Sequence, residues 1–279
     1  MNDVVFIADF FVNQVPGGGE LNNEELINIL IKRGHKVEKI NSHLATTEHI
    51  ENNKNSNFIV ANFINLKTNV QSALKDKKYI IYEHDHKYLL NRNPATYESF
   101  LAPSEEIINF DFYKNATVTV CQSKFHENIV EKNLKLDNIV NVGGNLWPVE
   151  ILDFLEEIST KAKKRACSIM ASSIEHKNTA GAIKYCKFKK EKYELIPALS
   201  YYSFLERLGA NDTLIFLPKT PETLSRIVVE SRMMGMKIIT NGFVGASKEN
   251  WFKLKGKALV DLMRHRREEI PSKIERYFE

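Results

Sequence analysis

The sequence predicts an α/β protein of two domains, each built on a sheet of parallel strands. Short apolar segments alternate with helical patterns along the chain, and 279 residues are enough for about two domains of ordinary size. A stretch rich in Gly, Asn and Pro, GGNLWPVE at residues 143–150, separates the strands into two series. We therefore expect one domain at residues 1–147, a hinge, and a second domain at residues 148–279.

Each expected strand is a short apolar run followed by polar or turn residues. The first series lies at residues 4–10, 36–40, 58–61, 79–82, 117–122 and 139–142, and the second at residues 167–171, 193–196, 213–217 and 237–240. Open parallel sheets bind ligands at the carboxyl ends of their strands. Two Rossmann-like halves that face each other across a cleft are therefore expected.

The composition is that of a soluble globular protein, with 43% hydrophobic and 27% charged residues. No apolar run approaches the length of a membrane span, and the apolar N-terminal segment VVFIADFF lacks a basic flank. That segment is expected to be a first strand, and the protein to be cytoplasmic. Cys121, Cys167 and Cys186 are widely spaced and include no CxxC pair, which argues against a disulfide framework or a structural zinc site.

The net charge of +4 is mildly basic. It favours phosphorylated or anionic substrates but is too small to indicate stable nucleic-acid binding. The KAKKR run at residues 161–165 has two interpretations: a contact with phosphate or membrane lipid at the protein periphery, or a solvated helix end. The sequence does not indicate an oligomeric state.

Three consecutive glycines, Gly17, Gly18 and Gly19, follow the first expected strand. Glycines let the backbone pass close to a ligand, and Glu20 then begins a helix. The alternative is a tight turn between strand and helix. The GxGxxG spacing of dinucleotide-binding enzymes is absent, so a dehydrogenase is disfavoured.

The segment EHDHK, residues 83–87, follows the strand at residues 79–82. On an extended chain His84 and His86 share one face and could bind a metal ion with a third ligand. No distant His or Cys pair offers that ligand, so no metal site is expected. The competing interpretation is a capped strand end with solvated histidines.

Two glutamates, Glu222 and Glu230, are separated by seven residues within a segment that reads as a helix followed by a strand. Pro221 precedes the expected helix start, and Gly235 fits its C-terminal end. Carboxylates on a half-buried helix can accept hydrogen bonds from the hydroxyls of a ribose or hexose, and the amides of Thr223 and Leu224 would attract phosphate at the helix N-terminus. The alternative is a solvated charged face.

In combination these motifs resemble the retaining GT-B glycosyltransferases of glycosyltransferase family four, the group of glycogen synthase and related mannosyltransferases. The matching features are the two glutamates with their spacing, the glycine loop followed by Glu20, and the RGH sequence at residues 33–35 before a strand. The resemblance covers nearly the whole chain as far as Glu230. It implies a GT-B fold, with an N-terminal acceptor domain and a C-terminal nucleotide-sugar donor domain that includes closing helices.

The resemblance also implies roles for individual residues. Glu222 and His84 would contact the transferring sugar, and Glu230 the ribose hydroxyls. The donor diphosphate would be bound by the remaining matched positions: Lys177, Thr223, Leu224, Ser225, and the loop of Gly17, Gly18 and Gly19.

One departure from the family pattern concerns the phosphate-binding cations. Ser172 and Ser173 stand where family members carry glycine and arginine. Lys219 or Arg226 would have to compensate for the missing arginine, or donor binding would be weaker. Ser225 replaces a glycine that often follows the first glutamate, but it is small enough to preserve access to the backbone.

These observations predict a retaining hexosyltransferase that uses a nucleotide sugar as substrate and needs no other cofactor. No DxD motif is present, which disfavours the metal-dependent GT-A class, and no GxSxG motif supports a hydrolase. The acceptor could be a lipid, a glycan, a protein or a modified DNA base. Two alternatives stay open: an inactive GT-B-like module that binds a sugar or a partner, and a nucleotide-sugar epimerase on the same fold.

Overall fold

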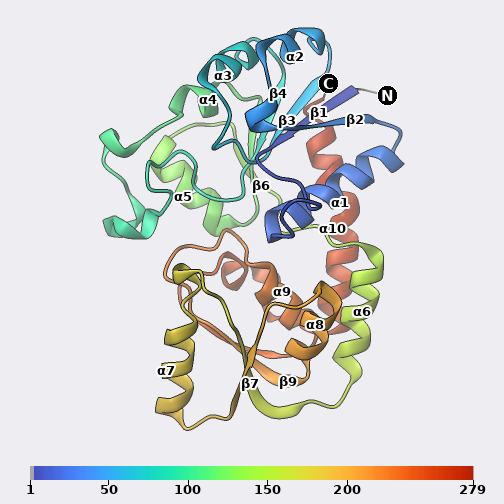
Figure 1. Ribbon diagram of the computed structural model, residues 1–279, viewed down its shortest axis with the longest axis vertical. Coiled ribbons are helices and arrows are strands. Elements are labelled where there is room, and N and C mark those ends of the chain that lie inside the picture. The colour runs from blue at the N-terminus through green and yellow to red at the C-terminus, as the bar shows by residue number, and fades with distance from the viewer. Residues whose placement is uncertain (1–2, 279) are drawn as a thin grey trace. The chain divides into compact units, whose positions relative to one another are not determined.

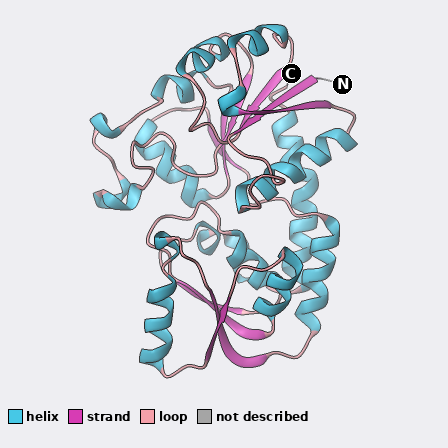
Figure 2. Ribbon diagram, viewed as in Figure 1, coloured by secondary structure: helices cyan, strands magenta, loops and turns pink. Residues whose placement is uncertain are grey.

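The computed structural model describes residues 3–278 and has an α/β fold (Figures 1 and 2). The chain divides into two compact units. Met1–Trp147 and Arg267–Glu279 make up the first unit, and Pro148–Arg266 make up the second. Among the described residues, no helix combines the length and the apolar character needed to cross a membrane.

The first unit contains a six-stranded sheet of order β2-β1-β3-β4-β5-β6, in which every neighbouring pair is parallel. Its elements are β1 (Asp3–Ala8), α1 (Gly18–Lys32), β2 (Lys36–Asn41), α2 (Thr47–Asn52), β3 (Asn57–Val60), α3 (Thr68–Leu74), β4 (Tyr79–Tyr82), α4 (Phe110–Asn115), β5 (Val118–Cys121), α5 (Lys124–Leu134) and β6 (Ile139–Asn141). All six strands expected here are confirmed. Ser123 caps α5 by accepting a hydrogen bond from the amide of His126 at 3.1 Å.

Both faces of the first sheet are buried at β1, β3, β4 and β5, which explains why these strands are continuous apolar runs, whereas the edge strand β2 is largely exposed. Successive side chains of β1 alternate between two apolar clusters. Val5 and Ile7 pack in the cluster that includes residues of α2 to α5, whereas Val4 and Phe6 pack in the one that includes α1.

The second unit contains a four-stranded parallel sheet of order β10-β9-β7-β8. Its elements are α6 (Val149–Thr160), β7 (Lys164–Met170), α7 (Thr179–Lys189), β8 (Tyr193–Ile196), α8 (Tyr201–Gly209), β9 (Asn211–Phe216), α9 (Arg226–Met233), β10 (Lys237–Thr240) and the first part of α10 (Lys257–Glu275). The four strands expected here are also confirmed. Gly235 follows α9 with a φ of 82°, the left-handed conformation expected of a glycine that ends a helix.

The end of α10 belongs to the first unit, although the sequence placed residues 267–279 with the second domain. Ile270, Ile274 and Phe278 are buried in the same apolar cluster as β1 and α1. Arg33 Nη1 lies 2.5 Å from Glu275 Oε2, and His35 Nε2 lies 3.0 Å from Glu275 Oε1. Arg33 and His35 of the RGH sequence therefore hold the C-terminal segment in the first unit. Packing between residues far apart in the sequence, and not their order along the chain, decides which unit this segment joins.

Each sheet has one point at which the chain reverses the direction in which it adds strands. In the first unit this topological switch point lies between β1 and β3, and in the second unit between β7 and β9. In open α/β sheets, ligands bind beyond the carboxyl ends of the strands at such points. The loops after these four strands are therefore where a site is expected in each unit.

Candidate functional site

The glycine loop lies at the switch point of the first unit. Gly17 is the N-cap of α1, and Gly18 and Gly19 form its first turn. A Cβ atom at Gly17 would lie 2.3 Å from Glu20 Oε2, and one at Gly19 would lie 3.5 Å from Cγ of His84. Glycine at position 17 therefore makes room for the Glu20 carboxylate, and the loop passes directly beside His84.

Glu20 was expected from the sequence as a helix start and as part of the matching glycine-loop motif, but without a role of its own in the site. Its Oε1 accepts a hydrogen bond from Nδ2 of Asn62, which follows β3, at 3.4 Å. Burial raises the pKa of the Glu20 carboxyl above its usual range. A half-buried carboxyl group with a raised pKa beside a glycine loop can accept a proton from, or donate one to, a bound ligand.

His84 follows β4 and has both ring nitrogens in hydrogen bonds. Nε2 lies 2.6 Å from Oδ1 of Asn23 on α1, and Nδ1 is paired with the side-chain amide of Gln122, which follows β5. Because Asn23 Oδ1 can only accept, the hydrogen sits on His84 Nε2, and Nδ1 accepts from Gln122. Asn23 and Gln122 were missed by sequence reasoning. Gln122 could have been found as the polar residue directly after an apolar strand.

Glu83 and Lys87 of the EHDHK segment are buried, whereas the Asp85 side chain is partly exposed. Lys87 Nζ lies 2.6 Å from Glu83 Oε1 and 3.1 Å from Asp85 Oδ1, and the Tyr113 hydroxyl donates to the other oxygen of Glu83. Burial alone would lower the pKa of Lys87, but the carboxylates of Asp85 and Glu83 raise it. The segment is therefore held by a charged ammonium group between two carboxylates.

His86 is buried as well, so the interpretation of a solvated histidine is wrong for this residue. Its Nδ1 lies 3.1 Å from the Tyr88 hydroxyl, and its ring contacts the ring of His126 edge to face. Burial lowers the pKa of His86 to about 3. Within residues 3–278, no three side chains of His, Cys, Asp or Glu are placed to hold a metal ion.

In the second unit, Lys177 and Glu222 meet at the switch point. Lys177 comes from the 3-10 turn η5 (Glu175–Lys177) after β7, and Glu222 from the loop after β9. Lys177 Nζ lies 2.7 Å from Glu222 Oε1, with 25% and 15% of the two side chains exposed. A partly exposed ion pair at the carboxyl end of a parallel sheet is accessible to a charged or hydroxylated ligand.

The helix expected to start at residue 222, directly after Pro221, begins only at Arg226, so that Glu222, Thr223 and Leu224 are not helical. Instead, the Glu222 amide donates to Phe243 O at 2.7 Å, and Ala246 donates to Leu224 O at 3.0 Å. Ser225, the N-cap of α9, has a φ of 78°. The expected helix start is wrong because the loop pairs with the segment after β10 and then turns sharply.

Glu230 lies inside α9 and is 3% exposed. Its Oε1 accepts a hydrogen bond from the hydroxyl of Tyr201 at 2.5 Å and lies 3.4 Å from Nε of Arg226. Burial, and next the charge of Glu230, raise the pKa of Tyr201. Sequence reasoning missed Tyr201, whose position at the start of α8, shortly after β8, was the available signal.

The two proposed substitutes for the missing arginine lie in different surroundings. The Lys219 amide donates to His176 O at 2.8 Å, next to Lys177, and the Lys219 side chain is half exposed and paired with Glu175 at 2.8 Å. Arg226 is buried against Glu230 and Tyr201. The Ser172 side chain is engaged within its own loop, because its Oγ accepts a hydrogen bond from the amide of Ile174. Lys219 is thus the cation that adjoins the Lys177 loop.

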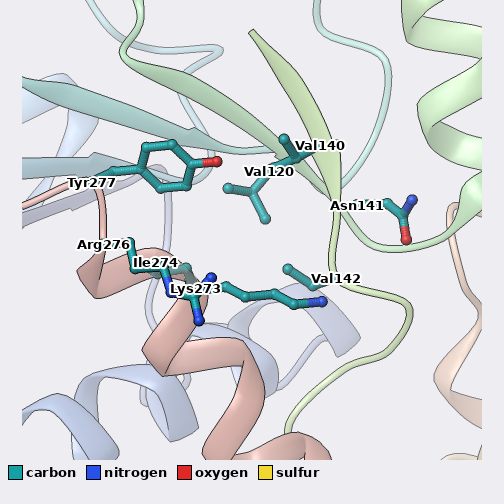
Figure 3. Close-up of a pocket in the computed structure, with 8 residues that line it drawn as sticks. All are labelled: Val120, Val140, Asn141, Val142, Lys273, Ile274, Arg276 and Tyr277. Carbon is teal, nitrogen blue, oxygen red and sulfur yellow. The ribbon is translucent and has the colours of Figure 1, made fainter.

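A cavity of about 240 Å³ lies elsewhere in the first unit and includes none of the sequence-predicted site residues (Figure 3). Val120 and Val140 line one side of it, and Lys273 and Arg276 line the other (Figure 3). The Tyr277 hydroxyl points toward the two valines. The sequence-predicted site therefore consists of the two switch points and not of this cavity.

The architecture defines a GT-B fold, with two parallel Rossmann-like sheets in one chain. No family model matches the sequence, and no curated protein matches it. The fold is similar to that of Anabaena HepE, solved with UDP and glucose, at 10% identity and a TM-score of 0.57 over 97% of this chain and 90% of that one.

Two further solved structures have the same fold. The catalytic domain of starch synthase IV from Arabidopsis thaliana, bound to ADP and acarbose, matches at 9% identity and a TM-score of 0.58 over 99% of this chain and 94% of that one. A glycosyltransferase from Rickettsia africae matches at 13% identity and a TM-score of 0.51 over 99% of this chain and 93% of that one. The GT-B fold expected from the sequence is confirmed.

Proposed function

We propose that this chain is a glycosyltransferase that moves a sugar from a nucleotide-sugar donor to an acceptor, with retention of anomeric configuration and without an essential metal ion. The observation that carries the proposal is the Lys177–Glu222 pair at the switch point of the second unit. A cation there can bind a diphosphate, and a carboxylate within 2.7 Å of it can accept hydrogen bonds from sugar hydroxyls.

In this proposal the donor diphosphate contacts Lys177, assisted by Lys219 from the adjoining loop. Helix N-termini favour anions through their backbone amides and dipole. Because α9 begins at Arg226, the amides of Arg226 and Ile227 take the place that the sequence assigned to Thr223 and Leu224.

The ribose of the donor would bind at Glu230. A carboxylate oxygen has room for more than one hydrogen-bond donor, so Glu230 can accept from ribose hydroxyls while Tyr201 and Arg226 hold it in place. The pairing with Tyr201 fixes the side-chain rotamer before the ligand arrives. A carboxylate that is fixed in advance loses less conformational entropy on binding.

The first unit would supply the acceptor side and contacts to the transferring sugar. His84, oriented by Asn23 and Gln122, would contact the transferring sugar when a sugar hydroxyl takes the place of one of these two hydrogen-bond partners, and the glycine loop would approach the donor and acceptor closely. Retention fits a reaction in which the leaving phosphate assists the acceptor and fixed dipoles stabilise an oxocarbenium-like state. Glu20 is the one carboxyl group of this loop that could instead serve as a base in an inverting reaction.

The test is incubation with radiolabelled nucleotide sugars, beginning with UDP- and ADP-sugars because the similar structures contain those nucleotides. We expect donor hydrolysis or transfer that is lost in Lys177→Ala. Binding without turnover would instead support the inactive module, and a changed sugar on an intact nucleotide would support the epimerase. The anomeric configuration of the product, read by NMR, tests retention.

EDTA tests the absence of an essential metal. We expect turnover to be unchanged when the protein is treated with the chelator and assayed in metal-free buffer. Loss of turnover that manganese or zinc restores would contradict this part of the proposal, and would direct attention to the carboxylates and histidines that follow β4.

A further inference from the structure

The surface of the second unit that carries the most basic charge is the outer face of α7 with the turn into β8. Five lysines lie there within nine residues, accompanied by a single acidic residue, Glu191. They are Lys184, Lys187, Lys189, Lys190 and Lys192, all exposed. Within residues 3–278 none of the five forms an ion pair with a carboxylate. The positive charge of this surface is therefore not neutralised by the protein.

Apolar side chains stand among these lysines. Phe188 is 79% exposed, the highest value of any large hydrophobic side chain in the described part of the chain. Tyr193 and Leu195 are also exposed, and they point to one face of β8, because strand side chains alternate. Glu194 between them points to the other face, where it pairs with Arg207 of α8. We call the five lysines with Phe188, Tyr193 and Leu195 the lysine–phenylalanine surface.

The fold itself does not require this arrangement. The inner face of α7 packs through Ala182 and Cys186 against β7 and β9, and Phe188 takes no part in that core. Lysines in the last turn of a helix interact favourably with the helix dipole, which explains why Lys187 and Lys189 lie there. The dipole does not explain the other three lysines or the exposed phenylalanine. Figure 1 shows α7 on the outside of the second sheet with no element beyond it, and β8 is an edge strand.

The basic run KAKKR, at residues 161–165, makes more contacts within the protein. In KAKKR, Lys161 pairs with Glu157 at 2.8 Å, and Lys163 donates to Gly209 O at 2.6 Å. These two lysines are therefore engaged within the protein. Lys164 and Arg165 are exposed, and within residues 3–278 neither forms an ion pair with a carboxylate, so this run offers two available cations where residues 184–192 offer five. The contact with an anionic surface that KAKKR suggested fits residues 184–195 better.

We propose that the lysine–phenylalanine surface docks the protein onto an anionic lipid bilayer. Clustered lysines near a helix are attracted to anionic headgroups, and exposed aromatic and aliphatic side chains enter the boundary between headgroups and acyl chains. Phe188 and Tyr193 could also stack on bases, so the choice of a bilayer over a nucleic acid rests on the other residues of the surface. The stretch contains no arginine, the residue that suits recognition of nucleic-acid phosphates best, and Leu195 is an aliphatic side chain that a bilayer can bury and a base cannot stack on.

The test is sedimentation of the full chain with vesicles of phosphatidylcholine containing roughly 30 mol% phosphatidylglycerol, compared with pure phosphatidylcholine, at low ionic strength. We expect binding only to the anionic vesicles, and a weaker interaction at high salt because exposed charges are screened. Each lysine near the surface contributes about a fivefold factor in partitioning, so Lys187→Gln/Lys190→Gln should lower the partition coefficient roughly 25-fold. Phe188→Ser should lower it as well, without changing the charge.

Lys54→Gln/Lys75→Gln is the matched control, because these two exposed lysines of the first unit also lack ion pairs and their loss changes the net charge equally. Equal loss of binding in the control and in the surface variant would overturn the proposal, since net charge alone would then explain the attraction. Failure of the unmodified protein to sediment with anionic vesicles would overturn it too. Tighter binding to a single-stranded oligonucleotide than to vesicles, measured by fluorescence anisotropy, would replace the bilayer by a nucleic acid.

Discussion

The two switch points of this protein have similar topology and very different chemistry. At the first, the groups beside the loop are glycines, amides, the half-buried carboxyl of Glu20 and a histidine whose two nitrogens are both engaged, and the nearby charges of Glu83 and Lys87 are buried and paired. At the second, Lys177 and Glu222 form a partly exposed pair, and Glu230 is held by Tyr201.

The ion pairs at the two switch points have different roles. A buried pair of charges holds a loop in place, and breaking it exposes the remaining partner to an apolar environment. A partly exposed pair contributes less to stability and is free to exchange its partner for a ligand. We therefore expect substitutions in the buried Glu83–Lys87 pair to act mainly on folding, and those in the Lys177–Glu222 pair to act mainly on donor binding and turnover.

The largest effect expected is on stability, from Lys87→Met. This change leaves Glu83 buried without its cation, and we expect the free energy of unfolding to fall by about 3 to 5 kcal/mol. Urea unfolding followed by circular dichroism measures it. Lys39→Met is the control, because Lys39 makes an exposed pair with Glu24 at 3.2 Å and should cost less than about 1 kcal/mol. Equal costs for the two variants would remove the distinction between the switch points.

The next effect is on turnover, from Glu222→Gln. If Glu222 contacts the sugar as charge develops, its loss should lower kcat by about 100-fold while donor KM changes little. Glu230→Gln should mainly raise donor KM, because ribose binding is the same in the ground state and in the transition state. Steady-state kinetics and melting temperatures separate these outcomes from misfolding. Full activity in both stably folded variants would make the seven-residue spacing a coincidence.

A smaller effect is expected on diphosphate affinity. Lys177→Ala removes one charged hydrogen bond and should weaken binding of the nucleoside diphosphate by about 1.5 to 3 kcal/mol, or roughly ten- to 150-fold in Kd. Lys219→Ala, at a more exposed position, should change Kd only about twofold. Lys237→Ala is the control, since Lys237 is exposed at the opposite end of the sheet. Calorimetric affinity of Lys177→Ala within twofold of the unmodified protein would rule out this assignment.

The smallest effect should come from Tyr201→Phe, which removes only the hydroxyl that orients Glu230. A hydrogen bond to a charged group contributes about 1.5 to 3 kcal/mol, but Arg226 still holds Glu230 after this change, so donor KM should rise only roughly fivefold with kcat unchanged. Tyr202→Phe is a matched control on the same helix, because Tyr202 is exposed and its ring packs on Phe154. A similar rise in KM for both variants would show that the Tyr201–Glu230 contact has no special role.

The sequence alone determined the ten strands, their division into two parallel sheets, and caps such as Ser123 and Gly235. Each of these features depends on a pattern within a few residues. An apolar run, an N-cap serine and a glycine in the left-handed conformation each set the structure of the residues next to them in the chain. The expectation that polar residues after the strands would gather at common edges follows from the same patterns.

Only the tertiary structure decided which partners those residues have. Lys177 and Glu222 are 45 positions apart, and the loop at residues 222–225 is not helical because it pairs with the segment after β10. The burial of Lys87 and the packing of residues 267–278 with the first unit likewise depend on distant side chains. Local patterns do not contain this information. The burial of a side chain and the partner of its charge depend on residues that are distant in the sequence and become neighbours only in the folded structure.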